Sequence, residues 1–165
     1  MKDSSSNSQD HPIETETYKR LENLANLLDN AFNIPGTSYN IGIDPILGIF
    51  PLVGDYLGLF LSSYILWESA KLGASKYTIS SMAVNLIIDM LIGVFPFFGD
   101  IFDVAWKAND KNIVLLKNHL QSPQKQKKVD KLFLFLLLSI LFIFITIITT
   151  ITFMILKFIF SSLNL

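Results

Sequence analysis

Acidic and amide side chains inside apolar segments are the groups in this 165-residue chain whose type and spacing could do chemistry. Five stand out, namely Asp44, Asp55, Asn85, Asp89 and Asp100. Ionisable groups at membrane depth are expensive and commonly mark ion or substrate pathways. Broken helices with polar ends build the central sites of transporters. An intramembrane aspartyl protease is a third hypothesis, which would need two aspartates to share one site.

The interpretation that we favour for three of these aspartates is structural. Pro51 and Pro96 each remove a backbone donor and end a helix. Asp55 and Asp100 follow four residues later, where each carboxylate can accept hydrogen bonds from the free N–H groups of the next helix. Asp44 stands before a proline, which is the order expected of an N-cap followed by the first helical position.

Asp89 is the exception, because it lies in the middle of a predicted helix among apolar residues. Asn85 lies four residues before it and Thr78 seven residues before Asn85, so the three side chains share one helix face. An unpaired carboxylate in such surroundings is costly. We therefore expect Asp89 to face a protein partner or a bend of the other copy of the internal repeat described below, and not lipid.

Other chemistry finds no support in the sequence. Cysteine is absent, which excludes disulfides, thiolate zinc sites and cysteine nucleophiles. The two histidines, His11 and His119, do not form a pair with metal-ligand spacing, and no phosphate-binding or nucleophile-elbow motif occurs. We predict no catalytic residues, no cofactor, no metal site and no enzymatic activity.

The element that determines the protein class is the C-terminal apolar run. Residues 132–156 contain no charge, proline or glycine, and about 20 apolar helical residues span a bilayer core. The chain as a whole is 51% hydrophobic and 16% charged, with a mean hydropathy of +0.46, which is typical of membrane proteins rather than soluble domains. We predict a transmembrane helix over 132–160.

Lysines before this run predict its orientation. Residues 107–131 carry seven lysines and two acidic residues, and the far end of the run carries Lys157 alone. By the positive-inside rule, residues 107–131 with the Lys-rich linker 121–131 are cytoplasmic in a plasma or inner membrane, and the C-terminus points outward. A nucleic-acid patch is disfavoured because no aromatic stacking platform accompanies the lysines.

The N-terminal region divides into a polar tail and an amphipathic helix. Residues 1–13 have no apolar run and are expected to be disordered. Residues 14–34 show helical spacing of apolar side chains, with a polar face opposite. The apolar stripe comprises Tyr18, Leu21, Ala25, Leu28 and Phe32, and the polar face Lys19, Glu22, Asn23, Asn26 and Asp29. The helix either docks on the body of the protein, which we favour, or lies in the membrane interface.

An internal repeat occupies the middle of the chain. Residues 43–55 and 88–100 match at seven of 13 positions with an offset of 45, which predicts a duplicated helical membrane domain over 35–120 with repeats at about 40–72 and 85–118. Helices are expected at about 45–50, 56–72, 76–94 and 101–120, with Gly73 closing the second and Ser75 capping the third.

Two topologies satisfy the central helices. Either residues 56–72 and 76–94 cross the bilayer as a hairpin, or each Phe-Pro-x-x-Gly bend is the tip of a re-entrant loop whose ends return to the cytoplasm. The amphipathic helix 101–120 is expected to leave the apolar body and run along the cytoplasmic interface.

These motifs also resemble a known family. The Ile-Asp-Pro-x-Leu-Gly-x-Phe-Pro-x-x-Gly-Asp run that starts at Ile43, the pair Trp67-Glu68, and the segment Phe102 to Asn109 resemble the domain of unknown function 4112 family. The resemblance covers roughly residues 22–120. It implies a small, mostly bacterial, membrane-associated helical domain, and it implies no activity, cofactor or catalytic residue.

The sequence thus predicts an all-α, membrane-embedded helical protein. The favoured function is a non-enzymatic integral membrane module that contacts the lipid bilayer and binds a protein partner or lipid, with no nucleic-acid partner. The alternative is a small oligomeric transporter or channel that uses Asp89, Asn85 and the motif aspartates; a chain this short would need to form a homo-oligomer to enclose a pathway.

Overall fold

The computed structural model describes residues 15–33, 40–43, 53–93, 106–122 and 129–162. The described fold is helical, as predicted. Its helices are α1 (Glu16–Asn30), α3 (Val53–Lys71), α4 (Lys76–Gly93), α6 (Ala108–Gln121) and α7 (Lys131–Ser162). A two-residue antiparallel ladder, β1 (Phe32–Asn33) with β2 (Asn40–Ile41), was not predicted; Phe32 pairs with Ile41 and Asn33 with Asn40.

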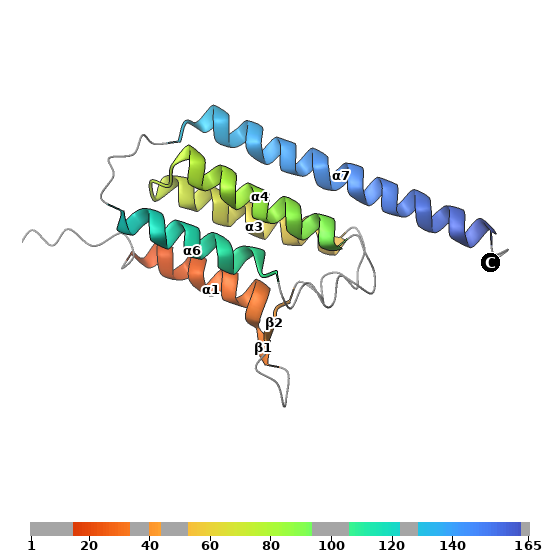
Figure 1. Ribbon diagram of the computed structural model, residues 1–165, viewed down its shortest axis with the longest axis horizontal. Coiled ribbons are helices and arrows are strands. Elements are labelled where there is room, and N and C mark those ends of the chain that lie inside the picture. Colours follow the sequence, from red (N-terminus) through yellow and green to blue (C-terminus); the bar gives the residue numbers. More distant parts are fainter. Residues whose placement is uncertain (1–14, 34–39, 44–52, 94–105, 123–128, 163–165) are drawn as a thin grey trace, which may run out of the picture.

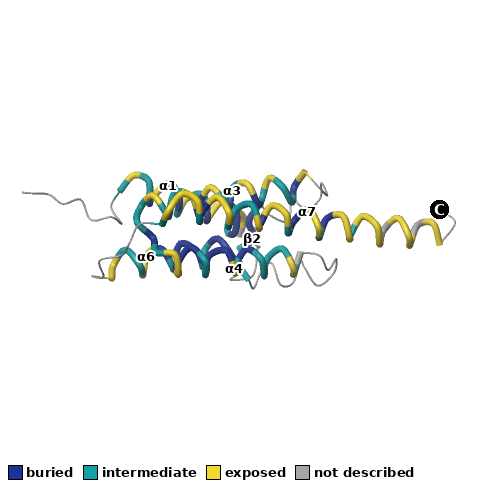
Figure 2. The backbone as a smooth tube through the Cα atoms, turned by 90° about the horizontal axis from the view of Figure 1, so that it is seen from above, coloured by how far each residue is buried: buried dark blue, intermediate teal, exposed yellow. Residues whose placement is uncertain are grey.

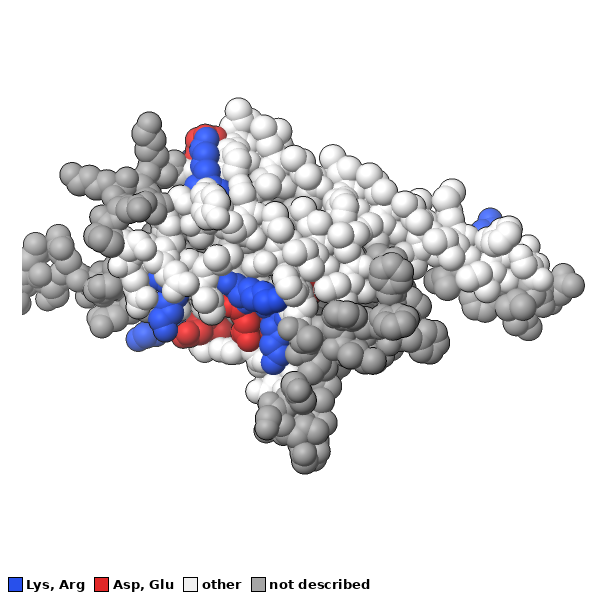
Figure 3. All heavy atoms as spheres, viewed as in Figure 1, with Lys and Arg blue, Asp and Glu red and all other residues white. Residues whose placement is uncertain are grey.

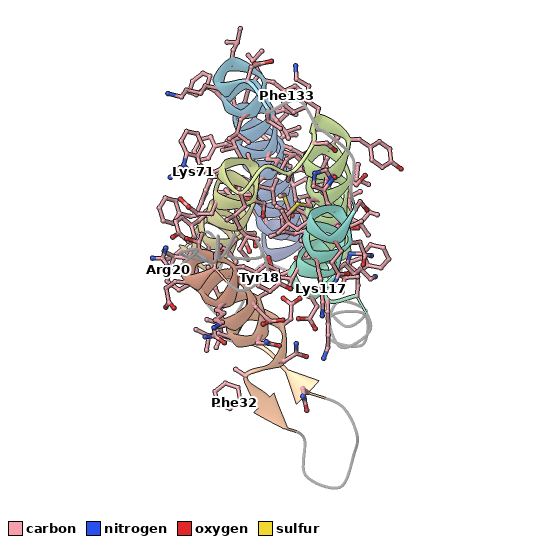
Figure 4. The ribbon with its side chains drawn as sticks, turned by 90° about the vertical axis from the view of Figure 1, so that its left-hand side faces the viewer. Tyr18, Arg20, Phe32, Lys71, Lys117 and Phe133 are labelled. Atoms are coloured by element: carbon pink, nitrogen blue, oxygen red, sulfur yellow. The ribbon has the colours of Figure 1, made fainter. Side chains whose placement is uncertain are left out.

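The helices pack side by side in three layers (Figure 1). Viewed along the bundle, α7 lies on one side, α3 and α4 lie beneath it, and α1 and α6 form the opposite side (Figure 4). Each helix contributes fully buried apolar side chains to one core, among them Leu21, Ile65, Met82, Leu116 and Leu141. The body is therefore a single helix bundle with α7 along one side.

Helix α1 forms because its start is capped and its apolar residues recur on one face. The Thr15 hydroxyl accepts a hydrogen bond from the Tyr18 backbone N–H at 3.3 Å, which satisfies a free donor of the first turn. Its buried stripe packs against α3 and α6, so the docked interpretation is confirmed. The helix ends at Asn30 and not near residue 34, and Phe32 leaves the stripe for the ladder, where it is 55% exposed.

The turn between α3 and α4 follows the sequence signals. Gly73 has a φ of +103°, a conformation that glycine adopts without steric cost, and the Ala74 N–H closes the turn on the Ser69 carbonyl at 3.0 Å. The Ser75 hydroxyl then caps α4 by accepting from the Thr78 N–H at 3.1 Å. Both predicted roles, of Gly73 as helix stop and Ser75 as helix cap, are confirmed.

Two expectations about helix placement are wrong. Trp106 and Lys107 are not helical, so α6 begins at Ala108 instead of continuing from residue 101. Helix α6 also does not leave the body, since it packs extensively against α4 and α1. Its apolar face, with Ile113 and Leu116 buried, covers protein and not a membrane interface.

Helix α7 has a different character from the rest. Its first turn is capped by Asp130, whose carboxylate accepts from the Phe133 N–H at 2.7 Å. Among the described residues it is the one helix long and apolar enough to cross a membrane, over Lys131–Ile159. Only 22% of its most apolar window is buried in the protein, and its C-terminal part extends beyond the bundle and consists mainly of exposed residues (Figure 2).

Several predictions lie outside the described residues. These are the disordered tail at 1–13, the helix at 45–50, the Pro51 and Pro96 bends, and the greater part of both repeat motifs. Asn40 and Asn85 also stand 45 positions apart, but Asn40 lies in β2 and Asn85 in α4, so these two equivalent positions do not share a structure. The duplication stays a prediction from the sequence.

Candidate functional site

The polar face of α4 lies against α6. The Thr78 hydroxyl bonds His119 Nδ1 at 2.9 Å, and the Asn85 side-chain Nδ2 donates to Asn112 Oδ1 at 2.8 Å. Asp89, one turn further, interacts electrostatically with Lys111. Helices α4 and α6 run antiparallel (Figure 1), so the three pairs follow one another along the interface. We call these six residues the α4–α6 ladder.

The ladder continues at both ends through backbone groups. His119 Nε2 lies 3.1 Å from the Gly73 carbonyl and donates to it, which leaves Nδ1 to accept from Thr78 in the neutral tautomer. At the other end, the Trp106 indole N–H donates to the Asn85 backbone carbonyl at 3.3 Å. Asn112 is fully buried, and buried polar groups that pair in this way fix the register of two helices.

A second polar cluster joins α1 to the start of α6. Asp29 on α1 is 7% exposed. Its carboxylate accepts from Asn109 Nδ2 and from the Asp110 backbone N–H, each at 2.8 Å. Asp110 lies in the first turn of α6. Asp29 of α1 therefore caps that turn, and its carboxylate lies at the positive end of α6. Sequence analysis placed Asp29 on the polar face, and that placement is wrong.

Asn30 extends this second cluster toward solvent. Its Nδ2 donates to Asp110 Oδ2 at 2.6 Å, and its Oδ1 accepts from the Lys107 ammonium. The chain that follows β2 holds the end of α1 in place: the Ile43 N–H donates to the Leu27 carbonyl at 3.2 Å. A Cβ on Gly42 would lie 1.3 Å from the Leu28 carbonyl oxygen, so only glycine permits this approach.

Burial and hydrogen bonds oppose one another at Asp29. Burial raises the pKa of its carboxyl to about 6, while the hydrogen bonds from Asn109 and Asp110 lower it. At Lys111, burial lowers the pKa of the ammonium and the Asp89 carboxylate counteracts this shift. Lys111 Nζ also lies 2.9 Å from the centre of the Trp106 ring, a contact that favours the cation.

The free energy of unfolding is expected to fall as pH rises from about 4 to 7. Between its ordinary pKa of 3.8 and about 6, Asp29 binds more protons in the folded chain than in the unfolded chain, so its contribution to stability is present at low pH and lost above pH 6. The loss is at most about 3 kcal/mol. Asp29→Asn removes the titrating group and should flatten this part of the profile, measured by urea unfolding in detergent.

A direct titration separates Asp29 from other groups. The carboxyl carbon shift of Asp29, followed by NMR, should have its midpoint near pH 6. A midpoint near 4, or the same unfolding profile in the wild type and in Asp29→Asn, would contradict this assignment.

An open groove of about 710 Å³ runs between α4 and α6 beside the ladder. Its walls mix lysine, aspartate and amide groups with apolar side chains. The lining residues are Ser81, Val84, Asn85, Lys107, Asp110, Lys111, Val114 and Leu115.

The structure brings together two of the five residues singled out in the sequence. Asn85 and Asp89 both face α6. Asp55 lies within the first turn of α3, on a different helix, at a position where the helix dipole favours a negative charge. The helix starts at Val53, so Gly54 is already helical and is not the bend that the sequence predicted. Asp44 and Asp100 lie outside the described residues.

No group of three or more histidine, aspartate and glutamate side chains that could hold a metal ion occurs in residues 15–33, 40–43, 53–93, 106–122 and 129–162. The polar clusters join helix to helix, so what this arrangement does chemically is to pair buried polar groups and fix the positions of α1, α4 and α6.

One comparison with known proteins finds a match. The profile of a protein family described as Domain of unknown function (DUF4112) matches residues 17–120. The match includes α1, α3, α4 and α6 and stops before α7. No curated protein and no solved structure matches the chain.

Proposed function

The chain belongs to the domain of unknown function 4112 family, and from this premise we propose that it is a non-enzymatic integral membrane module. Helix α7 is its anchor, and the bundle of α1, α3, α4 and α6 is the part that binds lipid or a protein partner. Because the family match stops at residue 120, the anchor is an addition to the family domain.

The exposed apolar surface of α7 carries this proposal. A helix this apolar in the core of a soluble protein would be covered on all sides, but most of α7 is not. A helix that lies flat in the membrane interface needs a polar face, and the residues from Ile151 to Ile155 have none that is charged. A helix crossing the bilayer satisfies both observations.

The lysine distribution sets the direction of the proposed crossing. Lys131 begins the helix and the other lysines of residues 107–131 precede it, so the N-terminal end of α7 lies on the cytoplasmic side of a plasma or inner membrane and the C-terminus on the opposite side. Lys157 is exposed near the far end, where its long side chain reaches the outer head groups.

The transporter hypothesis gains no specific support. It would use Asn85 and Asp89, and although Asn85 lines the open groove, the described contacts of both residues are within the bundle: Asn85 is hydrogen-bonded to Asn112, and Asp89 interacts with Lys111.

Membrane extraction tests the proposal. Cell membranes containing the full chain are washed with high salt and then with alkaline carbonate, and the washed material is floated on a sucrose gradient. The protein is expected to stay with the floating membranes after both washes, because carbonate removes peripheral proteins and leaves crossing helices in place. Recovery in the carbonate supernatant would overturn the proposal.

A further inference from the structure

The outer face of α3 is apolar from Val53 to Trp67. Five side chains at intervals of four and three residues are 36–70% exposed there. We call them the α3 stripe: Val53, Leu57, Phe60, Tyr64 and Trp67. This spacing places all five on one side of a helix. A helix in contact with water normally carries polar residues on that side, so the stripe is an unpartnered apolar face.

The α3 stripe is continuous with the apolar surface of α7. Helices α3 and α7 pack against each other. The Tyr56 ring lies 5.5 Å from that of Phe142, and the Tyr56 hydroxyl bonds Thr146 Oγ1 at 3.0 Å. The neighbouring part of α7 also exposes large apolar side chains: Leu132, Phe135, Leu136, Ile140, Phe142 and Ile143. The two helices together make one apolar side of the molecule.

Charged side chains gather away from α7 on the face that Figure 3 draws. Figure 3 shows lysine, arginine and acidic groups over α1 and α6, while the α7 side is uncharged except at the two ends of that helix. At the end of the α3 stripe, Lys71 Nζ lies 5.7 Å from the Trp67 ring and 2.7 Å from Glu68. A tryptophan beside a lysine is typical of the head-group level. On the face that Figure 3 draws, uncharged surface over α7 is thus separate from charged surface over α1 and α6.

The length of α7 explains how a crossing helix can present such a side to lipid. Its apolar run, residues 132–156, has 25 residues and measures about 38 Å at 1.5 Å per residue, whereas the hydrocarbon core is about 30 Å thick. A helix longer than the core tilts. When α7 is tilted, one side of the bundle packed on it faces water. The other side, which carries the α3 stripe, faces the membrane.

We propose that the α3 stripe is a membrane-contact surface whose occupant is the acyl chains of the bilayer, with α1 and α6 facing water. This inference rests on the proposed function, because it needs α7 as the anchor. Lipid fits the stripe better than a soluble protein does, because the stripe lies on a helix that packs against α7, and α7 is itself exposed and apolar. The consequence is that the bundle lies against the membrane and does not hang free from the anchor.

Site-directed spin labelling tests this placement, and the absence of cysteine from the chain makes each label unique. Single variants Phe60→Cys and Leu57→Cys report on the stripe, Ile151→Cys on the anchor, and Asn23→Cys on the exposed face of α1. The labelled full-length chains are reconstituted in phosphatidylcholine–phosphatidylglycerol vesicles. Relaxation by oxygen, which concentrates in lipid, is compared with relaxation by a water-soluble nickel chelate.

Labels at residues 60, 57 and 151 should lose relaxation by nickel and respond to oxygen, while the label at Asn23 should respond to nickel. If residue 151 is in lipid and both stripe labels respond to nickel, the inference fails and the proposed function stands. If residue 151 responds to nickel, the proposed function itself fails. If the stripe labels respond to neither reagent and couple to one another between chains, a second copy covers the stripe and the inference is overturned. Two stripe positions are used so that one variant that fails to fold does not decide the result.

Discussion

Leu116→Ala is expected to lower the free energy of unfolding by about 3 kcal/mol, within the 2–5 kcal/mol typical of leucine truncation in a packed core. Leu116 is fully buried on α6, and α6 packs against α4 on one side and α1 on the other. The truncation removes the apolar contacts and leaves a cavity between three helices that are held by hydrogen-bonded polar pairs, so the site cannot easily collapse. Urea unfolding followed by circular dichroism in detergent measures the change.

Val114→Ala is the matched control. Val114 lies on the same helix, two residues earlier, and is 55% exposed, so its truncation should cost less than about 1 kcal/mol. The pair distinguishes two positions for α6. In the bundle, Leu116 is costly and Val114 is not; a helix lying free along the membrane interface would give similarly small effects at both residues, and that result would contradict the described packing.

Local patterns predicted the local structure. The apolar spacing from Tyr18 to Leu28 identified the buried face of α1, Gly73 and Ser75 marked the turn between α3 and α4, and the apolar run marked α7. Each of these depends on residues within one or two turns of one another, so the information needed is contained in a short segment of the sequence.

Partners across the bundle could not be predicted in the same way. An amphipathic pattern shows which face of α6 is buried, but not whether protein or a membrane interface covers it, and the placement of α6 was therefore wrong. Asn85 and Asp89 were singled out as candidate site residues, but their contacts with Asn112 and Lys111 connect residues more than 20 positions apart. The function of these residues stays a prediction.

Asp29 was missed although a signal for it exists. It follows Tyr18 by 11 residues, which is close to three full turns of a helix, so the two side chains share a face. Tyr18 is 2% exposed, and the same periodicity that assigned Tyr18 to the core therefore places Asp29 beside the core. A carboxylate at such a position needs partners, and the first turn of α6 supplies them.

Three lysines on the exposed face of α7 are expected to release the protein from membranes, whereas one is not. Residues 132–156 contain 19 leucine, isoleucine and phenylalanine residues, which favour insertion by about 6–11 kcal/mol in total. A lysine near the helix centre costs about 3 kcal/mol. The single substitution Ile147→Lys therefore leaves insertion favourable. In the triple variant Ile143→Lys, Ile147→Lys and Ile151→Lys, the cost of the three lysines offsets the favourable free energy of insertion. All three isoleucines are 50–57% exposed, so the protein core is not disturbed.

Flotation on a sucrose gradient after a carbonate wash measures this release, because aggregated protein sediments while membrane-inserted protein floats. The triple variant should disappear from the floating fraction, and the single variant should remain there. A control with the same added charge, Asn23→Lys, Asn118→Lys and Gln121→Lys, alters exposed positions on α1 and α6 and should float like the wild type. If the triple variant of α7 also floated after the wash, the anchor would have to lie elsewhere in the chain. Three lysines in the centre of a crossing helix would cancel the favourable free energy of its insertion.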